Sequence, residues 1–119
     1  MAMQSEVSIR EAKVEDVPKL VVVMKELADG EDLSAYIETY EARLREQAFG
    51  PTPRIKVLLA ELDGEIVGLV SCTVRSSNGG ELEFIKIDEL VVREDARGRG
   101  IGQALMQRLN EVVPHRGRL

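Results

Sequence analysis

Three glycines at alternate positions near the end of the 119-residue chain, Gly98, Gly100 and Gly102, could hold a phosphate group. They lie between an apolar stretch and an amphipathic one, so they are expected to link a strand to the first turn of a helix. Amide groups at a helix N-terminus lack intrahelical partners and carry the positive end of the helix dipole. Glycine removes the Cβ atoms that would keep a ligand away, and Arg97 and Arg99 add forked donors suited to phosphate. The stretch therefore predicts a site for a phosphorylated cofactor.

Two of the three common glycine-loop patterns do not fit these residues. A dinucleotide fingerprint needs a third glycine at the sixth position, where the chain has Gln103 or Leu105 depending on the starting glycine. A P-loop needs Gly-Lys followed by Ser or Thr, and that sequence is absent. The pattern Arg-x-x-Gly-x-Gly, which starts at Arg97 and ends at Gly102, remains.

Hydrophobic periodicity places the loop within a longer order of elements, β-α-α-β-β-β-α. Asp63-Gly64 is a strong hairpin signal, Asp16 can cap the first helix, and Pro114 ends the last. This order indicates an α+β (mixed α/β) fold with helices packed on a largely antiparallel sheet. The expected strands cover 7–10, 55–62, 65–75 and 82–92, and the expected helices cover 17–28, 33–48 and 101–113.

The strand expected over 82–92 has an irregular pattern. Ile85 and Ile87 are apolar at odd positions, whereas Leu90 and Val92 are apolar at even ones. Side chains of a strand alternate between two faces, so a strand with one buried face would not have this pattern. Burial on both faces is one explanation, and a β-bulge between Ile87 and Leu90 is the other. Gly68, in the preceding strand, likewise suggests a bulge or a close backbone approach.

With the loop in this order of elements, the chain resembles the GNAT superfamily of N-acetyltransferases, which use acetyl-coenzyme A. The resemblance covers 87–106 throughout, and 9–12 and 62–68 are also similar. It implies one GNAT-like domain over residues 1–119 with the acyl-CoA N-acyltransferase fold, in which helices cover both faces of the sheet. The implied reaction is transfer of an acetyl group from acetyl-CoA to a primary amine of a small molecule or a protein.

The resemblance also assigns residues to the coenzyme. Backbone groups at the strand end would bind the pantetheine arm, and amides of the loop would bind the pyrophosphate. The alternative is a surface loop with helix-capping glycines and solvated arginines. The coenzyme-binding residues implied in this way are Leu90, Val91, Val92, Arg97, Gly98, Arg99, Gly100, Ile101 and Gly102.

Acetyl transfer requires a base that frees the amine of its proton, and a carboxylate near the strand end could act directly or through water. Asp88 and Glu89 are the candidates, and the sequence does not distinguish between them. Solvated carboxylates at a strand margin are the alternative reading. Asp29, Glu31 and Asp32 make the loop between the first two helices acidic, which would suit a cationic amine, although a solvated turn explains them as well.

The chain departs from the family after Val113, where family members continue with further strands and a helix that often carries a tyrosine acid. We therefore expect a C-terminally truncated GNAT fold whose strand ending at Val92 has an unpaired apolar edge. A homodimer would cover that edge, and a fragment of a longer acetyltransferase is the alternative. A catalytically reduced acetyl-CoA-binding or interaction module, or a purely structural dimer, also remains open.

The charge and the composition of the chain exclude several classes of partner. A net charge of −5 and an aromatic content of 3% argue against nucleic acid. No apolar run has the length of a membrane span and no signal-peptide pattern opens the chain, so we expect a cytoplasmic protein. One cysteine, Cys72, and one histidine, His115, exclude a Cys- or His-based metal site, and we expect no metal.

Overall fold

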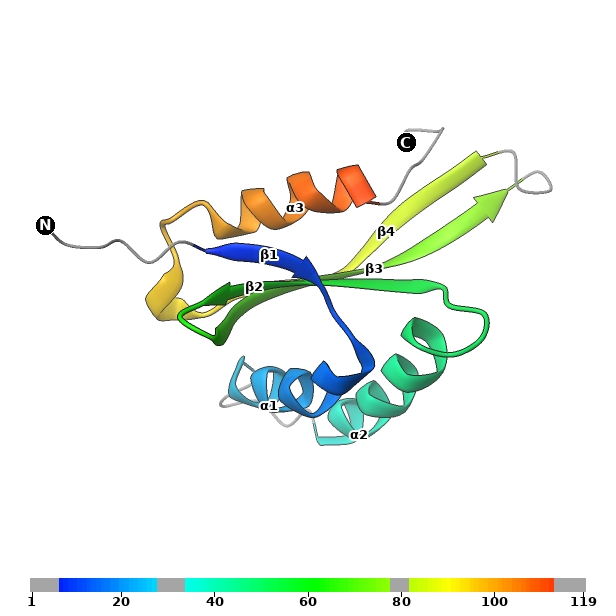
Figure 1. Cartoon of the computed structure of the whole chain (residues 1–119). Helices are drawn as coiled ribbons and strands as arrows, with labels where there is room; N and C mark the ends of the chain where they lie inside the picture. The colour runs from blue at the N-terminus through cyan, green and yellow to red at the C-terminus, as the bar shows by residue number, and fades with distance from the viewer. Residues whose placement is uncertain (1–6, 28–33, 78–81, 113–119) are drawn as a thin grey trace, which may run out of the picture.

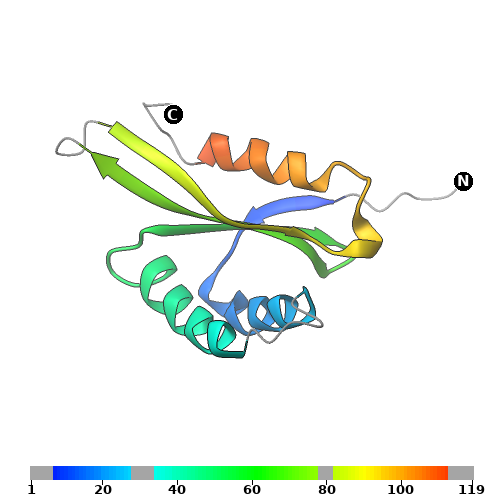
Figure 2. The same ribbon diagram turned by 180° about the vertical axis from the view of Figure 1, so that it is seen from behind.

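The fold is an antiparallel sheet between two layers of helix. The computed structural model describes residues 7–27, 34–77 and 82–112. Helices α1 and α2 cover one face of the sheet and α3 covers the other (Figures 1 and 2), which confirms the α+β class, the element order and the helices on both faces. The elements are β1 (Ser8–Glu11), α1 (Val17–Leu27), α2 (Ser34–Arg43), β2 (Ile55–Leu62), β3 (Glu65–Ser77), β4 (Leu82–Val92) and α3 (Ile101–Val112).

Short turns of other helical types join these elements. A 3₁₀ turn over Val14–Asp16 precedes α1, and another over Glu94–Ala96 precedes the glycine loop. The second helix reaches Ala48 as expected, but its last five residues, Leu44–Ala48, form a π-helical turn. No helix in the described ranges is long and apolar enough to cross a membrane.

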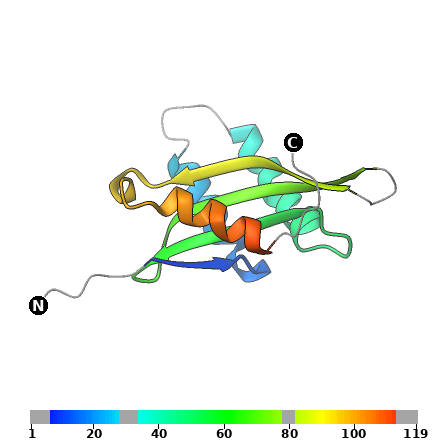
Figure 3. The ribbon, with the colours of Figure 1, turned by 90° about the horizontal axis from the view of Figure 1, so that it is seen from above.

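The strands form a meander in the order β1-β2-β3-β4, and each is antiparallel to the next (Figure 3). The turn between β2 and β3 is the hairpin that the sequence predicts. Asp63 and Gly64 both have positive φ, at 53° and 80°, which is the backbone geometry of a type I′ turn.

Strand alternation divides the core into two layers. Val57 and Leu59 of β2 pack with α1 and α2, whereas Leu58 and Ala60 pack under α3. Strand β2 therefore has buried side chains on both faces, as its nearly continuous apolar sequence requires. Tyr40 of α2 is buried in the first layer, where burial raises the pKa of its hydroxyl to about 12.

Two β-bulges interrupt the alternation. In the β2–β3 ladder Ala60 pairs with Gly68 but Glu61 pairs with Ile66, so Val67 is the extra residue. In the β3–β4 ladder Ser71 pairs with Glu89 but Cys72 pairs with Ile87. Asp88 is therefore the extra residue of β4, which confirms a bulge between Ile87 and Leu90.

The outer edge of β4 has no neighbouring strand in the described part of the chain. Ile87 and Leu90 lie there with 38% and 43% of their surface exposed. Leu90 is opposite the α3-facing Val70, and Ile87 is opposite the α3-facing Cys72. The unpaired, partly apolar edge that the sequence predicts is confirmed for these residues.

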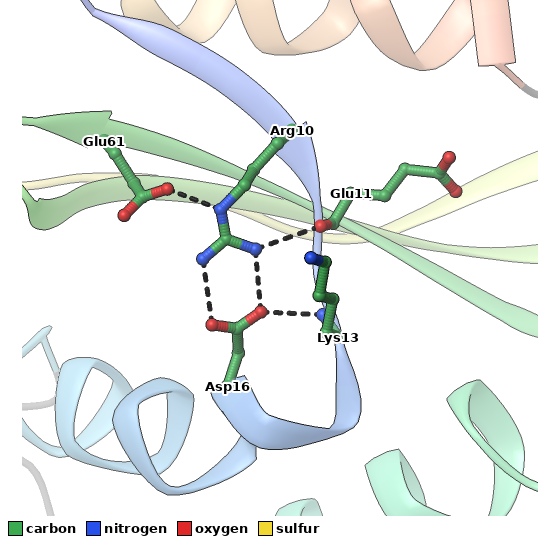
Figure 4. Close-up of polar contacts among 5 residues, drawn as sticks. All are labelled: Arg10, Glu11, Lys13, Asp16 and Glu61. Atoms are coloured by element: carbon green, nitrogen blue, oxygen red, sulfur yellow. Dashed lines mark hydrogen bonds and ion pairs between the residues drawn. The ribbon is translucent and has the colours of Figure 1, made fainter.

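A charged cluster connects β1, β2 and the turn before α1 (Figure 4). The guanidinium of Arg10 donates to both carboxylate oxygens of Asp16, at 2.8 and 2.9 Å, and its Nε donates to Glu61. The backbone N–H of Lys13 donates to Asp16 at 2.7 Å. Asp16 therefore caps the helical start from the last position of the 3₁₀ turn, where its carboxylate accepts the N–H of Lys13 in a capping box.

Arg10 lowers the pKa of Asp16 to about 2, so acid should weaken the fold through this carboxylate. A carboxylate whose pKa is lower in the folded than in the unfolded protein stabilises the fold at any pH above its unfolded-state pKa. This stabilisation is lost as the pH falls through the folded-state pKa. We expect the difference in unfolding free energy between the wild type and Asp16→Asn, on the order of 2 kcal/mol at pH 7, to shrink between pH 4 and pH 2. Urea titrations at several pH values measure it, and a difference that does not depend on pH would contradict the assignment.

Candidate active site

The bulge in β4 brings two consecutive carboxylates to one face of the sheet. Ser71 and Thr73 of β3 are two residues apart, so both face the α1/α2 layer. Ser71 Oγ donates to Glu89 Oε2 at 2.7 Å, and Thr73 Oγ1 donates to Asp88 Oδ2 at 2.6 Å. Both carboxylates therefore lie on this face, although neighbours in a regular strand would point to opposite faces.

The two carboxylates have different surroundings. Arg43 of α2 lies with its guanidinium 4.0 Å from Asp88 Oδ2, the same oxygen that Thr73 contacts. Glu89 has no ion-pair partner among the described residues, and burial raises the pKa of its carboxyl above the ordinary glutamate value. A half-buried carboxylate with a raised pKa has the properties of a general base for neutral pH.

At the end of β4, the backbone N–H and C=O groups of successive residues point alternately toward β3 and toward the open edge. The N–H of Arg93 donates to the carbonyl of Val67 at 2.7 Å, so residues at odd positions from 89 to 93 direct their backbone groups toward β3. Leu90 and Val92 therefore direct theirs toward the open edge, and Val91 directs its own toward β3. Arg97 Nε donates to the outward carbonyl of Val92 at 3.2 Å.

The loop after β4 has the backbone geometry of a cradle. Gly98 and Gly100 have φ of 85° and 75°, a region that other residues rarely occupy. A Cβ added at either glycine would meet no atom within 4 Å, so torsion and not packing requires glycine here. Arg97 and Arg99 are exposed beside them. The Arg97 amide already donates to the carbonyl of Glu94 at 3.3 Å.

The loop ends at the first turn of α3. The N–H of Ala104 donates to the carbonyl of Gly100 at 3.0 Å, so the amides of Ile101, Gly102 and Gln103 precede the first helical hydrogen bond. A Cβ at Gly102 would also point into open space, and its φ is not positive. Neither torsion nor packing requires glycine at Gly102, although glycine weakens a helix by about 1 kcal/mol relative to alanine. The missing side chain at Gly102 leaves open space beside unpaired helix amides, so a ligand could approach them.

Gly68 positions this turn against the sheet. A Cβ at Gly68 would lie 3.1 Å from the carbonyl oxygen of Val91, 3.3 Å from Ile101 and 3.4 Å from Leu105. The bulge and the close approach that the sequence suggested for Gly68 are both present. The missing side chain lets the N-terminus of α3 and the end of β4 lie together.

Three site residues were missed by reading the sequence: Ser71, Thr73 and Arg43. A hydroxyl pair at alternate positions in an otherwise apolar strand is a signal for the first two, whereas Arg43 depends on how α2 packs. Asp29, Glu31 and Asp32 lie outside the described residues. The described residues contain no group of three or more His, Cys, Asp or Glu side chains that could hold a metal ion.

The sequence and the fold of this chain have counterparts in known proteins. The model of the acetyltransferase (GNAT) family matches residues 21–118. The thialysine N-epsilon-acetyltransferase of Bos taurus is 32% identical over 120 residues, which span 93% of this chain and 69% of the relative. The chain therefore belongs to the GNAT acetyltransferase family and is an acyltransferase.

Solved structures support the fold independently. The ribosomal-protein-alanine N-acetyltransferase of Brucella melitensis biovar Abortus 2308 has a TM-score of 0.70 at 24% identity, with 89% of this chain and 70% of that one covered. A predicted acetyltransferase of Clostridium acetobutylicum, solved with acetyl-CoA, has a TM-score of 0.64 at 17% identity, with 89% of this chain and 72% of that one covered. Because both structures are less than 25% identical to this chain, their similarity establishes the fold alone.

Alanine substitutions at Gly68 and Gly102 should change the stability of the fold in opposite directions. We expect Gly68→Ala to lower the unfolding free energy by roughly 1 kcal/mol, because Val91, Ile101 and Leu105 must give way to the added methyl. Gly102→Ala is the matched control, and it should raise stability by up to about 1 kcal/mol because its methyl meets open space. Urea unfolding measures both, and changes of the same sign would contradict this view of Gly68.

Proposed function

We propose that this acyltransferase moves an acetyl group from acetyl-CoA to the primary amine of a small cationic molecule. The observation that carries the proposal is the continuity of the outer edge of β4 with the glycine loop. Outward backbone groups of Leu90 and Val92 lead directly to Gly98 and Gly100, whose open, left-handed backbone precedes a helix N-terminus. We infer that a pantetheine arm would follow this edge and that its pyrophosphate would lie at the loop.

The proposed coenzyme contacts follow from this path. Amides from Gly98 to Gly102 would bind the pyrophosphate together with the exposed side chains of Arg97 and Arg99, and Ile101 would contribute its amide. The outward N–H groups of Leu90 and Val92 would bind the pantetheine arm. Val91, whose backbone faces β3, would shape the site through the strand and not through its own amide.

The proposed chemistry uses Glu89 as the base. Its carboxylate takes one proton from the ammonium form of the acceptor, and the freed nitrogen lone pair attacks the thioester carbon. A C–N bond forms, the C–S bond breaks, and the electron pair leaves on sulfur, which takes up the second amine proton. Glu89, which has no ion-pair partner among the described residues, also places negative charge where a cationic acceptor would lie.

The acceptor class draws support from the bovine relative, whose name specifies the ε-amine of thialysine. A lysine-like molecule has a primary amine at the end of a flexible chain, which can reach carboxylates that are partly buried. Amino groups of proteins are the other acceptors to compare.

Aspartate at Gly100 should remove coenzyme binding. The substitution places a side chain and a negative charge where the pyrophosphate would lie, so we expect at least a tenfold weaker affinity for acetyl-CoA, equivalent to about 1.4 kcal/mol. Gly64→Asp is the matched control, because Gly64 has a similar φ of 80° and equally open surroundings. Calorimetry measures both, and wild-type affinity in Gly100→Asp would show that the loop does not hold the coenzyme.

Turnover separates an active enzyme from a binding module. Thiol release from acetyl-CoA should rise above the blank with thialysine or lysine, and less with a peptide amino terminus. Release no faster than the blank with every amine, in protein that binds acetyl-CoA, would reject the enzymatic proposal and leave coenzyme binding alone.

We also propose that a second copy of the chain covers the half of β4 that precedes the bulge. Identical edges can pair across a two-fold axis, and Ile87 presents exposed apolar surface there. Light scattering should then report a dimer, and Ile87→Lys should produce a monomer because it places like charges on both edges. A monomeric wild type at micromolar concentration would contradict this proposal.

A further inference from the structure

Ser71 is an unusual residue for its place in the core. It is 2% exposed and lies on the α1/α2 face between Leu69, which is fully buried, and Thr73. Its cross-strand neighbour on β2 is the buried Val57. A hydroxyl in such surroundings costs free energy unless it is hydrogen-bonded. Within the described ranges, the Ser71 hydroxyl makes its hydrogen bond with Glu89.

The hydroxyl of Ser71 can support Glu89 in both of its protonation states. It donates to the carboxylate at 2.7 Å, which stabilises the charged form against the effect of burial. A serine hydroxyl can also rotate and accept a hydrogen bond from the protonated acid. It therefore fixes the position of the carboxyl group before and after a proton is taken up.

Asp88 is fixed in another way. Its Oδ2 atom accepts the hydroxyl of Thr73 and also faces the guanidinium of Arg43, and its side chain is only 13% exposed. A carboxylate with a cation and a hydroxyl on one oxygen is engaged by the protein itself. The adjacent carboxylates thus differ in their partners although they share one face.

We propose that Ser71 is a positioning residue that orients the Glu89 carboxylate to receive the proton of the acceptor amine, while Thr73 and Arg43 hold Asp88 as a structural anion. The proposal rests on the proposed function, because it assigns a role within that same site. It follows from the extra residue of β4, without which Glu89 would face away from Ser71.

Among the described residues, a few other charged or titratable groups belong to the elements around Glu89. Arg43 and the buried Tyr40 come from α2, and Asp88 comes from β4 itself. Lys86 lies opposite Thr73 and is exposed. Burial raises the pKa of Tyr40 to about 12, so its hydroxyl is neutral at physiological pH. Burial raises the pKa of Glu89 above the ordinary glutamate value, so Glu89 is the group whose titration we expect the acidic limb to report.

The test is the pH profile of Ser71→Ala with the best amine acceptor. Loss of the donor disfavours the carboxylate form, so the acidic limb of kcat/KM should move to higher pH by roughly one unit. We expect kcat to fall by roughly 10- to 100-fold because the carboxylate is no longer oriented. Thr73→Val is the matched control, since it removes the donor to Asp88 and should leave the acidic limb in place. Ser71→Thr keeps a hydroxyl and should restore the wild-type limb.

A second measurement does not depend on turnover. Carboxyl ¹³C NMR, with the Glu89 signal assigned from Glu89→Gln, should show that titration of Glu89 moves to higher pH in Ser71→Ala and not in Thr73→Val. Unchanged titration in Ser71→Ala, in protein whose wild type is active, would overturn the role of Ser71. Absence of turnover in the wild type would instead reject the proposed function on which that role depends.

Discussion

The extra residue in β4 is the constraint on which the site depends. Before the bulge, Ile85 and Ile87 face α3; after it, Val92 does, so the parity of the strand changes once. Without that change Glu89 would point toward α3, and no two consecutive side chains could share a face. The bulge therefore determines that both carboxylates lie on the α1/α2 face, and that Leu90 and Val92 direct backbone groups toward the open edge.

Most of the fold could be predicted because its signals are local. Asp63-Gly64 specifies the hairpin, the parity change between Ile87 and Leu90 indicates a bulge, and alternate glycines before an amphipathic stretch indicate the loop. The contacts around the carboxylates could not be predicted in the same way. Ser71 is 18 residues from Glu89, and Thr73 is 15 from Asp88. Such pairs depend on strand register, and Arg43 depends additionally on the position of α2.

Four glycines near the site show why the sequence predicts a loop more readily than the function of each residue in it. Gly98 and Gly100 are required by torsion, Gly68 by the closeness of α3, and Gly102 by neither. A sequence records all four as the same letter. Only the three-dimensional structure distinguishes glycines that shape the backbone from one whose missing side chain leaves space beside free amides.

Asp16, in the turn before α1, and Glu89, on β4, have opposite pKa shifts because a cation contacts the first carboxylate and none contacts the second among the described residues. Arg10 contacts Asp16 through two hydrogen bonds and lowers its pKa, so this pair stabilises the fold at neutral pH. Burial raises the pKa of Glu89, so its contribution to stability falls as pH rises through that pKa, and the charged form is a cost to the fold. The fold retains this cost on β4, the strand with the open edge, where a substrate amine could use the charge.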